Sequence, residues 1–232
     1  MFDFLLSNIE KEYSLVRVLK ESDRGSVSLL RHRSRGGRYI FRLFDGNAEV
    51  YKKLIGFECP ALPRIYDAAE KDGRTAVLEE YIQGDSLDFL LEGSLCSPAE
   101  ARDIMLRLCR GVWVLHSLGA VHRDIKPENV ILRGEDAVLI DFDASRIHKL
   151  LSGGDTRVLG TMGYAAPEQY GFSQTDHRAD IYSLGVLYNV MLTGQHPSRA
   201  IAGGKPGRII EKCTMTNPSK RYRDVLSLME SL

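Results

Sequence analysis

The sequence lacks a dominant charge and a cysteine framework. Its 31 Lys and Arg residues are balanced by 31 Asp and Glu residues, giving a formal net charge of +0. Without a field of one sign, the chain is not expected to recruit nucleic acid or an anionic membrane. No cysteines form a Cys-x-x-Cys pair, which argues against a zinc site or disulfides and favours reduced thiols in a cytoplasm. The cysteines are Cys59, Cys96, Cys109 and Cys213.

A long hydrophobic run is also missing. The longest one, residues 181–192, is shorter than the roughly 20 residues that cross a bilayer, and it predicts a buried helix instead. The first six residues are apolar apart from Asp3 and lack a basic leader and a cleavage site, so we expect no signal peptide. These absences predict a soluble, cytoplasmic protein with no membrane segment in this chain.

The first third of the chain has the pattern of a small sheet with one helix. Short apolar runs alternate with turn residues over residues 13–44, which predicts an antiparallel meander. Residues 48–55 have helical spacing, whereas residues 62–65 and 76–80 are strand-like and are separated by a turn at Lys71-Asp72-Gly73.

Beyond Gly84 the pattern becomes helical. Ser97, Pro98 and Glu100 supply a helix cap, a proline at the first position and an early acid, and Gly119 ends the run. Residues 180–192 predict a central helix and residues 218–232 a last amphipathic one. We therefore expect an α+β protein with a small β-rich lobe, a hinge near residues 80–84 and a larger helical lobe.

A predicted hairpin brings two metal-ligand types together. Two apolar runs within residues 130–140 flank a turn at Gly134, and closing this hairpin sets Asn129 against Asp141. An amide oxygen and a carboxylate make a hard-oxygen site suited to Mg²⁺, which keeps waters and is shared with substrate phosphates. On the loop leading in, Asp124 can orient a hydroxyl nucleophile, and Lys126 offers a point charge for a phosphoryl group.

These residues carry a resemblance to the eukaryotic-like protein kinase superfamily, and most of all to short bacterial Ser/Thr kinases. The segment 122–129 reads HRDIKPEN and resembles the family's catalytic loop, and Asp141-Phe142-Asp143 resembles its metal-binding triplet. Residues 160–168 (GTMGYAAPE) resemble the end of an activation segment. The resemblance implies a bilobal kinase fold in which residues 1–232 form one domain, with lobes 1–82 and 83–232. It also implies Mg²⁺ and ATP as cofactors and Ser/Thr side chains of a protein substrate.

The same resemblance implies roles outside the chemistry. Glu168 and Arg221 are expected to form a structural ion pair, and Asp180 is expected to brace the catalytic-loop backbone. Thr161 matches a threonine that helps to hold Asp124 and Lys126. Thr156 lies in a polar stretch, where Arg123 could receive a phosphate placed on it; an ordinary turn residue is the equal alternative.

The small lobe departs from the family pattern. The loop over the nucleotide, residues 20–27 (KESDRGSV), keeps a single glycine, so a plain turn is as well supported as a phosphate clamp. Arg42 stands where the family has lysine. It could hold phosphates, pair with Glu49 of the following helix, lock onto another carboxylate, or extend to solvent. Asp143 replaces a glycine, and aspartate tolerates left-handed backbone.

The resemblance also implies a nucleotide pocket. Glu79 aligns with the position at the back of the adenine pocket, and the hinge follows it. The residues expected to contact the nucleotide, besides Arg42 and Glu49, are Leu19, Val27, Ile40, Glu80, Ile82 and Ile131. On composition alone, the aliphatic ones are equally ordinary core residues.

Two other functions compete with a Ser/Thr kinase. A noncatalytic pseudokinase that acts as a nucleotide-binding protein or scaffold is suggested by Arg42 and the glycine-poor loop. A small-molecule phosphotransferase on the same fold is disfavoured by Arg123 before the catalytic aspartate and by Ala166-Pro167-Glu168. No pattern in the chain predicts an oligomeric state.

Overall fold

The computed structural model describes residues 1–147, 163–170 and 175–232. The chain divides into two compact units, Met1–Ile82 and Gln83–Leu232, which we call unit 1 and unit 2. A sheet dominates unit 1 and helices dominate unit 2, so the α+β class predicted from the sequence is confirmed.

Unit 1 is built on one five-stranded antiparallel sheet with the order β1-β2-β3-β5-β4. Its elements are α1 (Phe2–Glu12), β1 (Tyr13–Ser22), β2 (Gly25–His32), β3 (Arg38–Asp45), α2 (Glu49–Leu54), β4 (Ile65–Lys71) and β5 (Arg74–Glu80). Consecutive strands pair except where β5 lies between β3 and β4. The predicted meander over residues 13–44 is therefore confirmed, with tight turns after Ser22 and after His32.

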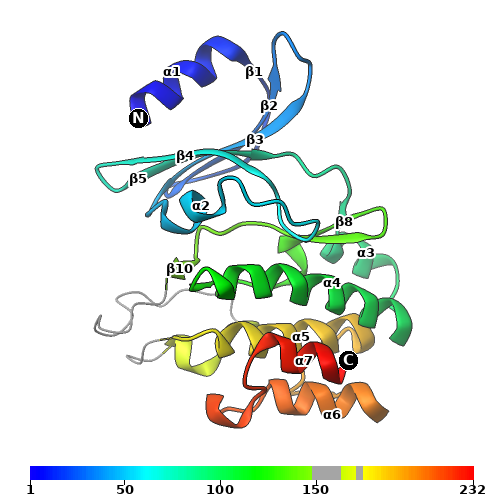
Figure 1. Cartoon of the computed structure of the whole chain (residues 1–232). Coiled ribbons are helices and arrows are strands. Elements are labelled where there is room, and N and C mark those ends of the chain that lie inside the picture. The colour runs from blue at the N-terminus through cyan, green and yellow to red at the C-terminus, as the bar shows by residue number, and fades with distance from the viewer. Residues whose placement is uncertain (148–162, 171–174) are drawn as a thin grey trace. The chain divides into compact units, whose positions relative to one another are not determined.

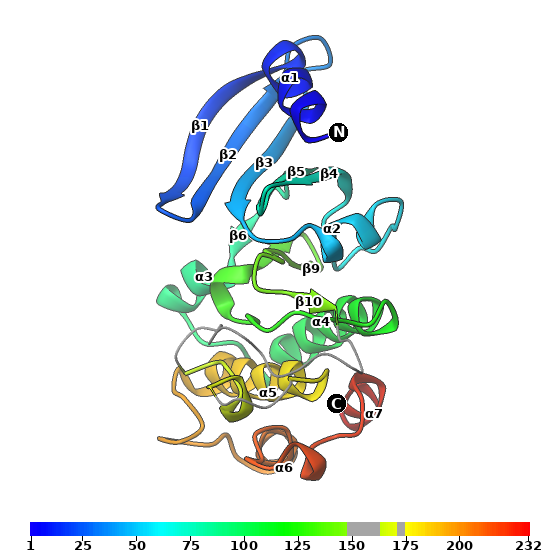
Figure 2. The same cartoon turned by 90° about the vertical axis from the view of Figure 1, so that its left-hand side faces the viewer.

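The two faces of this sheet are covered by different helices (Figure 1 and Figure 2). On one face, α1 places Leu5 in a cluster with Ala69 and Ala76, against which Phe41 and Leu43 of β3 also pack. Because side chains alternate along a strand, Ile40, Arg42 and Phe44 of β3 point to the opposite face. There the Phe44 ring contacts Tyr51 of α2, with ring centroids 5.9 Å apart. Arg42 thus lies in the layer between the sheet and α2.

Unit 2 is organised around α5, a helix that is buried along most of its length. Figure 1 and Figure 2 show α5 between α4 and α6. Gly185 of α5 allows the close approach to α6, because a Cβ atom there would collide with Cys213. The helices are α3 (Leu87–Gly93), α4 (Pro98–Ser117), α5 (Arg178–Thr193), α6 (Gly204–Cys213) and α7 (Val225–Ser231), with 3-10 turns η1 (Pro127–Asn129), η2 (Pro167–Tyr170) and η3 (Pro218–Lys220).

Short strands carry the polar loops of unit 2. β6 (Asp85–Ser86), β8 (Val130–Arg133) and β9 (Asp136–Leu139) form one small sheet, and β7 (Ala120–Val121) pairs with β10 (Arg146–Ile147). The predicted hairpin at residues 130–140 is β8 and β9, with Val130 opposite Leu139. The pairing of β7 with β10 brings the segment before His122 beside the segment after Asp143.

The helix signals in unit 2 behave as the sequence predicts. Ser97 accepts a hydrogen bond from the Glu100 N–H, and the Glu100 carboxylate accepts one from the Ser97 N–H, so a complete capping box begins α4. Gly119 follows the helix with a φ of 72°. Among the described residues, no helix combines the length and apolarity needed to span a membrane.

Three features of the fold differ from the sequence prediction. The expected strand at residues 62–65 is shifted, because β4 begins only at Ile65, after Pro63, which has no N–H to donate to a ladder. The expected helix over residues 218–232 is interrupted: Arg221 is extended, with ψ near −179°, and Asp224 caps a new helix by accepting from the Ser227 N–H. Helix α1 was not predicted at all.

Candidate active site

The backbone of the predicted catalytic loop is held by one buried carboxylate. Asp180 of α5, 0% exposed, accepts a hydrogen bond of 2.8 Å from the His122 N–H with one oxygen and one of 2.8 Å from the Arg123 N–H with the other. His116 of α4 contacts the same carboxylate at 2.9 Å. Burial alone would raise the pKa of Asp180, but the hydrogen bonds and the nearby histidines hold it below its ordinary value. The bracing role expected of Asp180 is confirmed.

Arg123 adopts a left-handed backbone conformation, with a φ of 72°. Such a conformation costs a residue other than glycine on the order of 1–3 kcal/mol and persists where surrounding contacts enforce it. Here the contacts lie on both sides of the residue. Its N–H is bound by Asp180, and its carbonyl oxygen accepts a hydrogen bond of 2.9 Å from Nε2 of Gln169. The chain direction into Asp124 is therefore set by side chains from α5 and η2.

The three predicted catalytic side chains lie together. Nζ of Lys126 is 3.2 Å from Oδ2 of Asp124. Nδ2 of Asn129 donates to the Asp124 backbone oxygen at 2.8 Å and to its Oδ2 at 3.1 Å. The Lys126 and Asp124 side chains keep limited solvent exposure, 19% and 17%. A partly exposed carboxylate that is oriented by a cation and an amide can accept a hydrogen bond from a hydroxyl group brought to it.

The β8–β9 hairpin places Asn129 and Asp141 at its open end. The Ile140 N–H donates to the Asn129 carbonyl at 2.9 Å, and Asp141 is the next residue. Because the Asn129 amide nitrogen is engaged with Asp124, its oxygen is the atom that can serve a metal ion. Carboxylate and amide oxygens suit Mg²⁺, which takes one or two protein ligands and completes its shell with water and phosphate. The two donors fit the predicted ion.

The triplet Asp141-Phe142-Asp143, which the resemblance predicts to bind metal, differs in one detail from the sequence prediction. The left-handed residue is Asp141, with a φ of 71°, and not Asp143, the residue that replaces glycine. The Asp143 N–H instead faces Oδ1 of Asp141 at 3.4 Å. Within residues 1–147, 163–170 and 175–232, no group of three or more His, Cys, Asp or Glu side chains is arranged to hold a metal ion. A metal at this position would therefore rely on substrate oxygens as well as on protein.

His122 links the catalytic loop to the triplet. Its Nε2 lies 3.3 Å from the Ile140 carbonyl, and its ring meets the Phe142 ring edge-on at 5.5 Å. Burial lowers the pKa of His122, and the charges of Asp180, Asp124 and Asp141 oppose that effect only in part. The neutral ring donates from Nε2 to Ile140 and leaves Nδ1 to accept from the Asp124 N–H at 3.3 Å.

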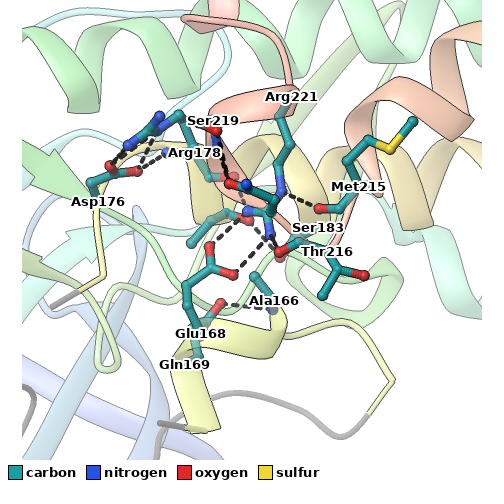
Figure 3. A network of polar contacts seen from close by, with 12 residues as sticks. Ala166, Glu168, Gln169, Asp176, Arg178, Ser183, Met215, Thr216, Ser219 and Arg221 are labelled. Atoms are coloured by element: carbon teal, nitrogen blue, oxygen red, sulfur yellow. Dashed lines mark hydrogen bonds and ion pairs between the residues drawn. The ribbon is translucent and has the colours of Figure 1, made fainter. Parts of the chain in front are cut away.

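A second polar network anchors the end of the predicted activation segment (Figure 3). Arg221 binds Glu168 with two hydrogen bonds of 2.6 and 2.8 Å, so the expected structural ion pair is confirmed. Arg221 also donates to the Arg178 carbonyl at 2.8 Å, and Ser183 of α5 donates to the Tyr164 carbonyl at 2.9 Å. The segment on both sides of Ala166 is thereby fixed to α5 and to Arg221, the residue directly after η3.

In unit 1, Arg42 is held by a carboxylate on the neighbouring strand. Its Nε donates to Oε1 of Glu79 at 2.6 Å, and the two side chains are 5% and 3% exposed. Val77 of β5 is opposite Arg42 and Glu79 is opposite Ile40, so the pair is a diagonal one on a single face of the sheet. The alternative in which Arg42 extends to solvent is wrong, and the alternative in which it locks onto a carboxylate is confirmed. Its pairing with Glu49, the first residue of α2, stays a prediction.

The glycine-poor loop is a two-residue turn between β1 and β2. Gly25 pairs with Ser22, and a Cβ atom at Gly25 would collide with the Leu43 carbonyl of β3. The surviving glycine is thus required by strand packing, whatever the loop does to a nucleotide. The other predicted nucleotide contacts lie on strands or at their ends: Leu19 in β1, Val27 in β2, Ile40 in β3, Glu80 at the end of β5, Ile82 at the end of unit 1 and Ile131 in β8.

Of the predicted regulatory residues, Arg123 is part of the loop described above, and Thr156 and Thr161 lie outside the described residues. One buried polar residue of the site, Gln169, was not predicted. Its only sequence signal is its place directly after the Ala-Pro-Glu segment.

Comparison with known proteins points to the same family that the sequence motifs resemble. The family model for the protein kinase domain matches residues 48–230. The chain is 31% identical over 208 residues to the serine/threonine-protein kinase pkn2 of Myxococcus xanthus, an alignment that covers 82% of this chain and 25% of that protein. It is 32% identical over 217 residues to the serine/threonine-protein kinase D of a Synechocystis strain, covering 83% of this chain and 42% of that protein.

A third relative, the serine/threonine-protein kinase PknL of Mycobacterium tuberculosis, is 32% identical over 195 residues, with 72% of this chain and 49% of that protein covered. The chain thus spans between 25% and 49% of the length of these three relatives.

Proposed function

Because this chain belongs to the protein kinase family, we propose that it is a serine/threonine kinase that transfers the γ-phosphoryl group of Mg-ATP to protein hydroxyls. The observation that carries the proposal is the arrangement of Asp124, whose carboxylate contacts both Lys126 and Asn129. The names of the relatives, each a serine/threonine-protein kinase, support the same activity. Residues 1–82 would form the smaller lobe of one kinase domain and residues 83–232 the larger.

In the proposed reaction, Asp124 accepts a hydrogen bond from the substrate hydroxyl and takes up its proton as the oxygen bonds to the γ-phosphorus. The bond between that phosphorus and the bridging oxygen breaks, and its electron pair leaves with ADP. Lys126 lies beside Asp124 and would balance the charge of the transferred group. Asn129 and Asp141 would hold Mg²⁺, which supplies further positive charge to the phosphates when bound.

Unit 1 would supply contacts to the nucleotide. We assign the adenine contacts to Leu19, Val27, Ile40 and Ile131, and the hinge contacts to Glu80 and Ile82. Arg42 and Glu49 would act on the phosphate side. A cation that is already paired with a carboxylate, as Arg42 is with Glu79, neutralises less of a phosphate's charge, so we expect weaker phosphate binding than a lysine would give.

That ion pair also favours a second candidate function. A pseudokinase would keep the fold and the ordered loop of unit 2 while using unit 1 to bind a nucleotide weakly or to bind a partner. Loss of phosphate positioning slows phosphoryl transfer, whereas loss of the metal ligands and the base tends to abolish it. Since Asp124, Asn129 and Asp141 are all present, an active enzyme remains the better-supported function.

The deciding experiment measures transfer of labelled γ-phosphate to the protein itself and to a generic basic protein. Asp124→Asn is the inactive comparison. Asp136→Asn is the matched control, because it changes the same type of side chain at the first residue of β9, where the carboxylate is 40% exposed and pairs with Arg107 and Arg133. Transfer by the wild type and by Asp136→Asn, but not by Asp124→Asn, supports the kinase; a wild type no better than Asp124→Asn rejects it.

Melting with and without Mg-ATP reports nucleotide binding separately. A ligand at about 100 times its Kd stabilises the folded state by about 2.7 kcal/mol. A melting shift without transfer would identify a pseudokinase. A higher transfer rate in Arg42→Lys would show that the arginine limits the reaction.

A further inference from the structure

Gln169 is a buried amide that joins the end of the predicted activation segment to the catalytic loop. It lies in η2 and is 1% exposed. Its Nε2 donates to the Arg123 carbonyl at 2.9 Å. Its Oε1 accepts from the Ala166 N–H at 3.1 Å (Figure 3). Both ends of the amide are therefore used, one on each of two segments that are far apart in the sequence.

The orientation of the Arg123 carbonyl determines the path of the backbone into Asp124. The carbonyl belongs to the same rigid peptide plane as the Asp124 N–H, so fixing the carbonyl also fixes the direction in which Asp124 leaves the loop. Asp180 binds the N–H on the other side of Arg123. With a φ of 72°, Arg123 would relax toward commoner backbone angles if either hold were lost.

The chemistry at this position admits few side chains. An amide can donate from one atom and accept at the other, whereas a carboxylate has no proton to donate and a thioether offers neither group reliably. With a carboxylate, the buried Arg123 carbonyl would lose its donor; with a thioether, the Ala166 N–H would also lose its acceptor. Each unsatisfied group costs about 1–3 kcal/mol.

We propose that Gln169 is a positioning residue for Asp124, through which the placement of residues 166–170 sets the geometry of the catalytic carboxylate. The inference rests on the proposed kinase function for its kinetic consequence. Its structural content, that Gln169 maintains the conformation of the catalytic loop, holds for an inactive protein as well.

The test compares Gln169→Glu with Gln169→Met. Gln169→Glu preserves shape but removes the donor, so kcat is expected to fall ~10- to 100-fold with the KM for ATP unchanged, because misplacing a reacting group by about 1 Å has an effect of that size. Burial raises the pKa of a carboxyl group, and the protonated form can donate again. The deficit of Gln169→Glu relative to wild type should therefore shrink as the pH falls from about 8 to about 6. Gln169→Met should show a deficit that does not change with pH.

Asn189→Asp is the matched control. Asn189 of α5 is also a fully buried amide that holds backbone carbonyls, donating to Gln195 at 2.7 Å and to Ala200 at 2.8 Å, but it is bonded to a different loop. The same amide-to-acid change there should lower the melting temperature while leaving kcat per folded molecule at the wild-type value. An equal loss of kcat in Asn189→Asp would overturn the proposal, because general destabilisation would then explain both variants.

Amide hydrogen exchange separates this inference from the kinase assignment. If the wild type transfers no more phosphate than Asp124→Asn, the proposed function fails, and the exchange rate of residues 119–129 decides the inference alone. Faster exchange there in Gln169→Glu or Gln169→Met, but not in Asn189→Asp, supports the positioning role. Wild-type kcat, where there is activity, together with unchanged exchange in both Gln169 variants overturns it.

Discussion

Unit 1 buries the Arg42 and Glu79 charges by pairing them with each other, whereas unit 2 uses buried side chains to hold backbone groups. Arg42 and Glu79 meet between neighbouring strands whose main-chain hydrogen bonds are made by the ladder itself. Asp180 and Gln169 instead bind the N–H groups and the carbonyl of the catalytic loop, which has no ladder. In unit 1 the two charges can be removed together, whereas in unit 2 the loop conformation depends on the buried side chains.

Replacing Asp180 together with His116, the side chain that contacts it, should show this dependence and give the largest effect. The double variant Asp180→Leu with His116→Leu removes the buried carboxylate together with the imidazole that contacts it, and the N–H groups of His122 and Arg123 lose their acceptor. At about 1–3 kcal/mol for each unsatisfied group, we expect the free energy of unfolding to fall by about 2–6 kcal/mol. Phosphate transfer should drop to the level of Asp124→Asn. Urea unfolding measures the loss of stability, and the transfer assay measures the loss of activity. A double variant that keeps the wild-type stability or the wild-type transfer rate would contradict the comparison.

The corresponding experiment in unit 1 should give the opposite pattern. Arg42→Ala removes the guanidinium that pairs with the buried Glu79 carboxylate, and breaking a buried pair in this way typically costs about 3–5 kcal/mol. Replacing both partners, as in Arg42→Leu with Glu79→Leu, removes both desolvation costs and should restore most of that loss.

Urea unfolding of the wild type, both single variants and the double variant forms a double-mutant cycle. A double variant as unstable as Arg42→Ala would mean that the pair supports main-chain geometry, as Asp180 does, and would remove the distinction between the units. The melting shift with Mg-ATP, measured on the double variant, reports whether Arg42 also binds phosphate.

The same distinction explains what the sequence could predict. Local signals sufficed wherever the contact partners are close in the chain: the Ser97 capping box lies within one helical turn, and the β8–β9 hairpin closes over a short turn. The predicted catalytic residues Asp124, Lys126 and Asn129 lie together because a single loop carries them.

Contacts between distant segments were harder to predict. The Arg42–Glu79 pair depends on the register of β3 against β5, which no local pattern specifies. The helix expected over residues 218–232 breaks because Arg221 is extended toward Glu168, which lies far back in the chain. In the sequence, Gln169 cannot be told apart from an ordinary polar residue, because its partner Arg123 is distant in the chain and only the fold brings the two together. Helix α1 does carry a local signal, the spacing of the apolar residues Leu5, Leu6 and Ile9, which pack on one face of the helix.

An exposed ion pair in unit 1 gives the smallest expected effect and separates burial from distance. Lys71 and Asp3 lie 2.7 Å apart, almost as close as Arg42 and Glu79, but their side chains are 51% and 74% exposed. Water and salt screen such a pair, and ordering two mobile side chains offsets the attraction. Asp3→Asn should therefore leave the melting temperature unchanged within experimental scatter at physiological salt.

Leu5→Ala is the control for this measurement. It empties a buried site of α1 against Ala69 and Ala76 and should cost about 2–5 kcal/mol, which shows that the assay detects loss of this helix's packing. A melting shift in Asp3→Asn as large as that of Leu5→Ala would mean that short distance, and not burial, determines what an ion pair contributes in this unit.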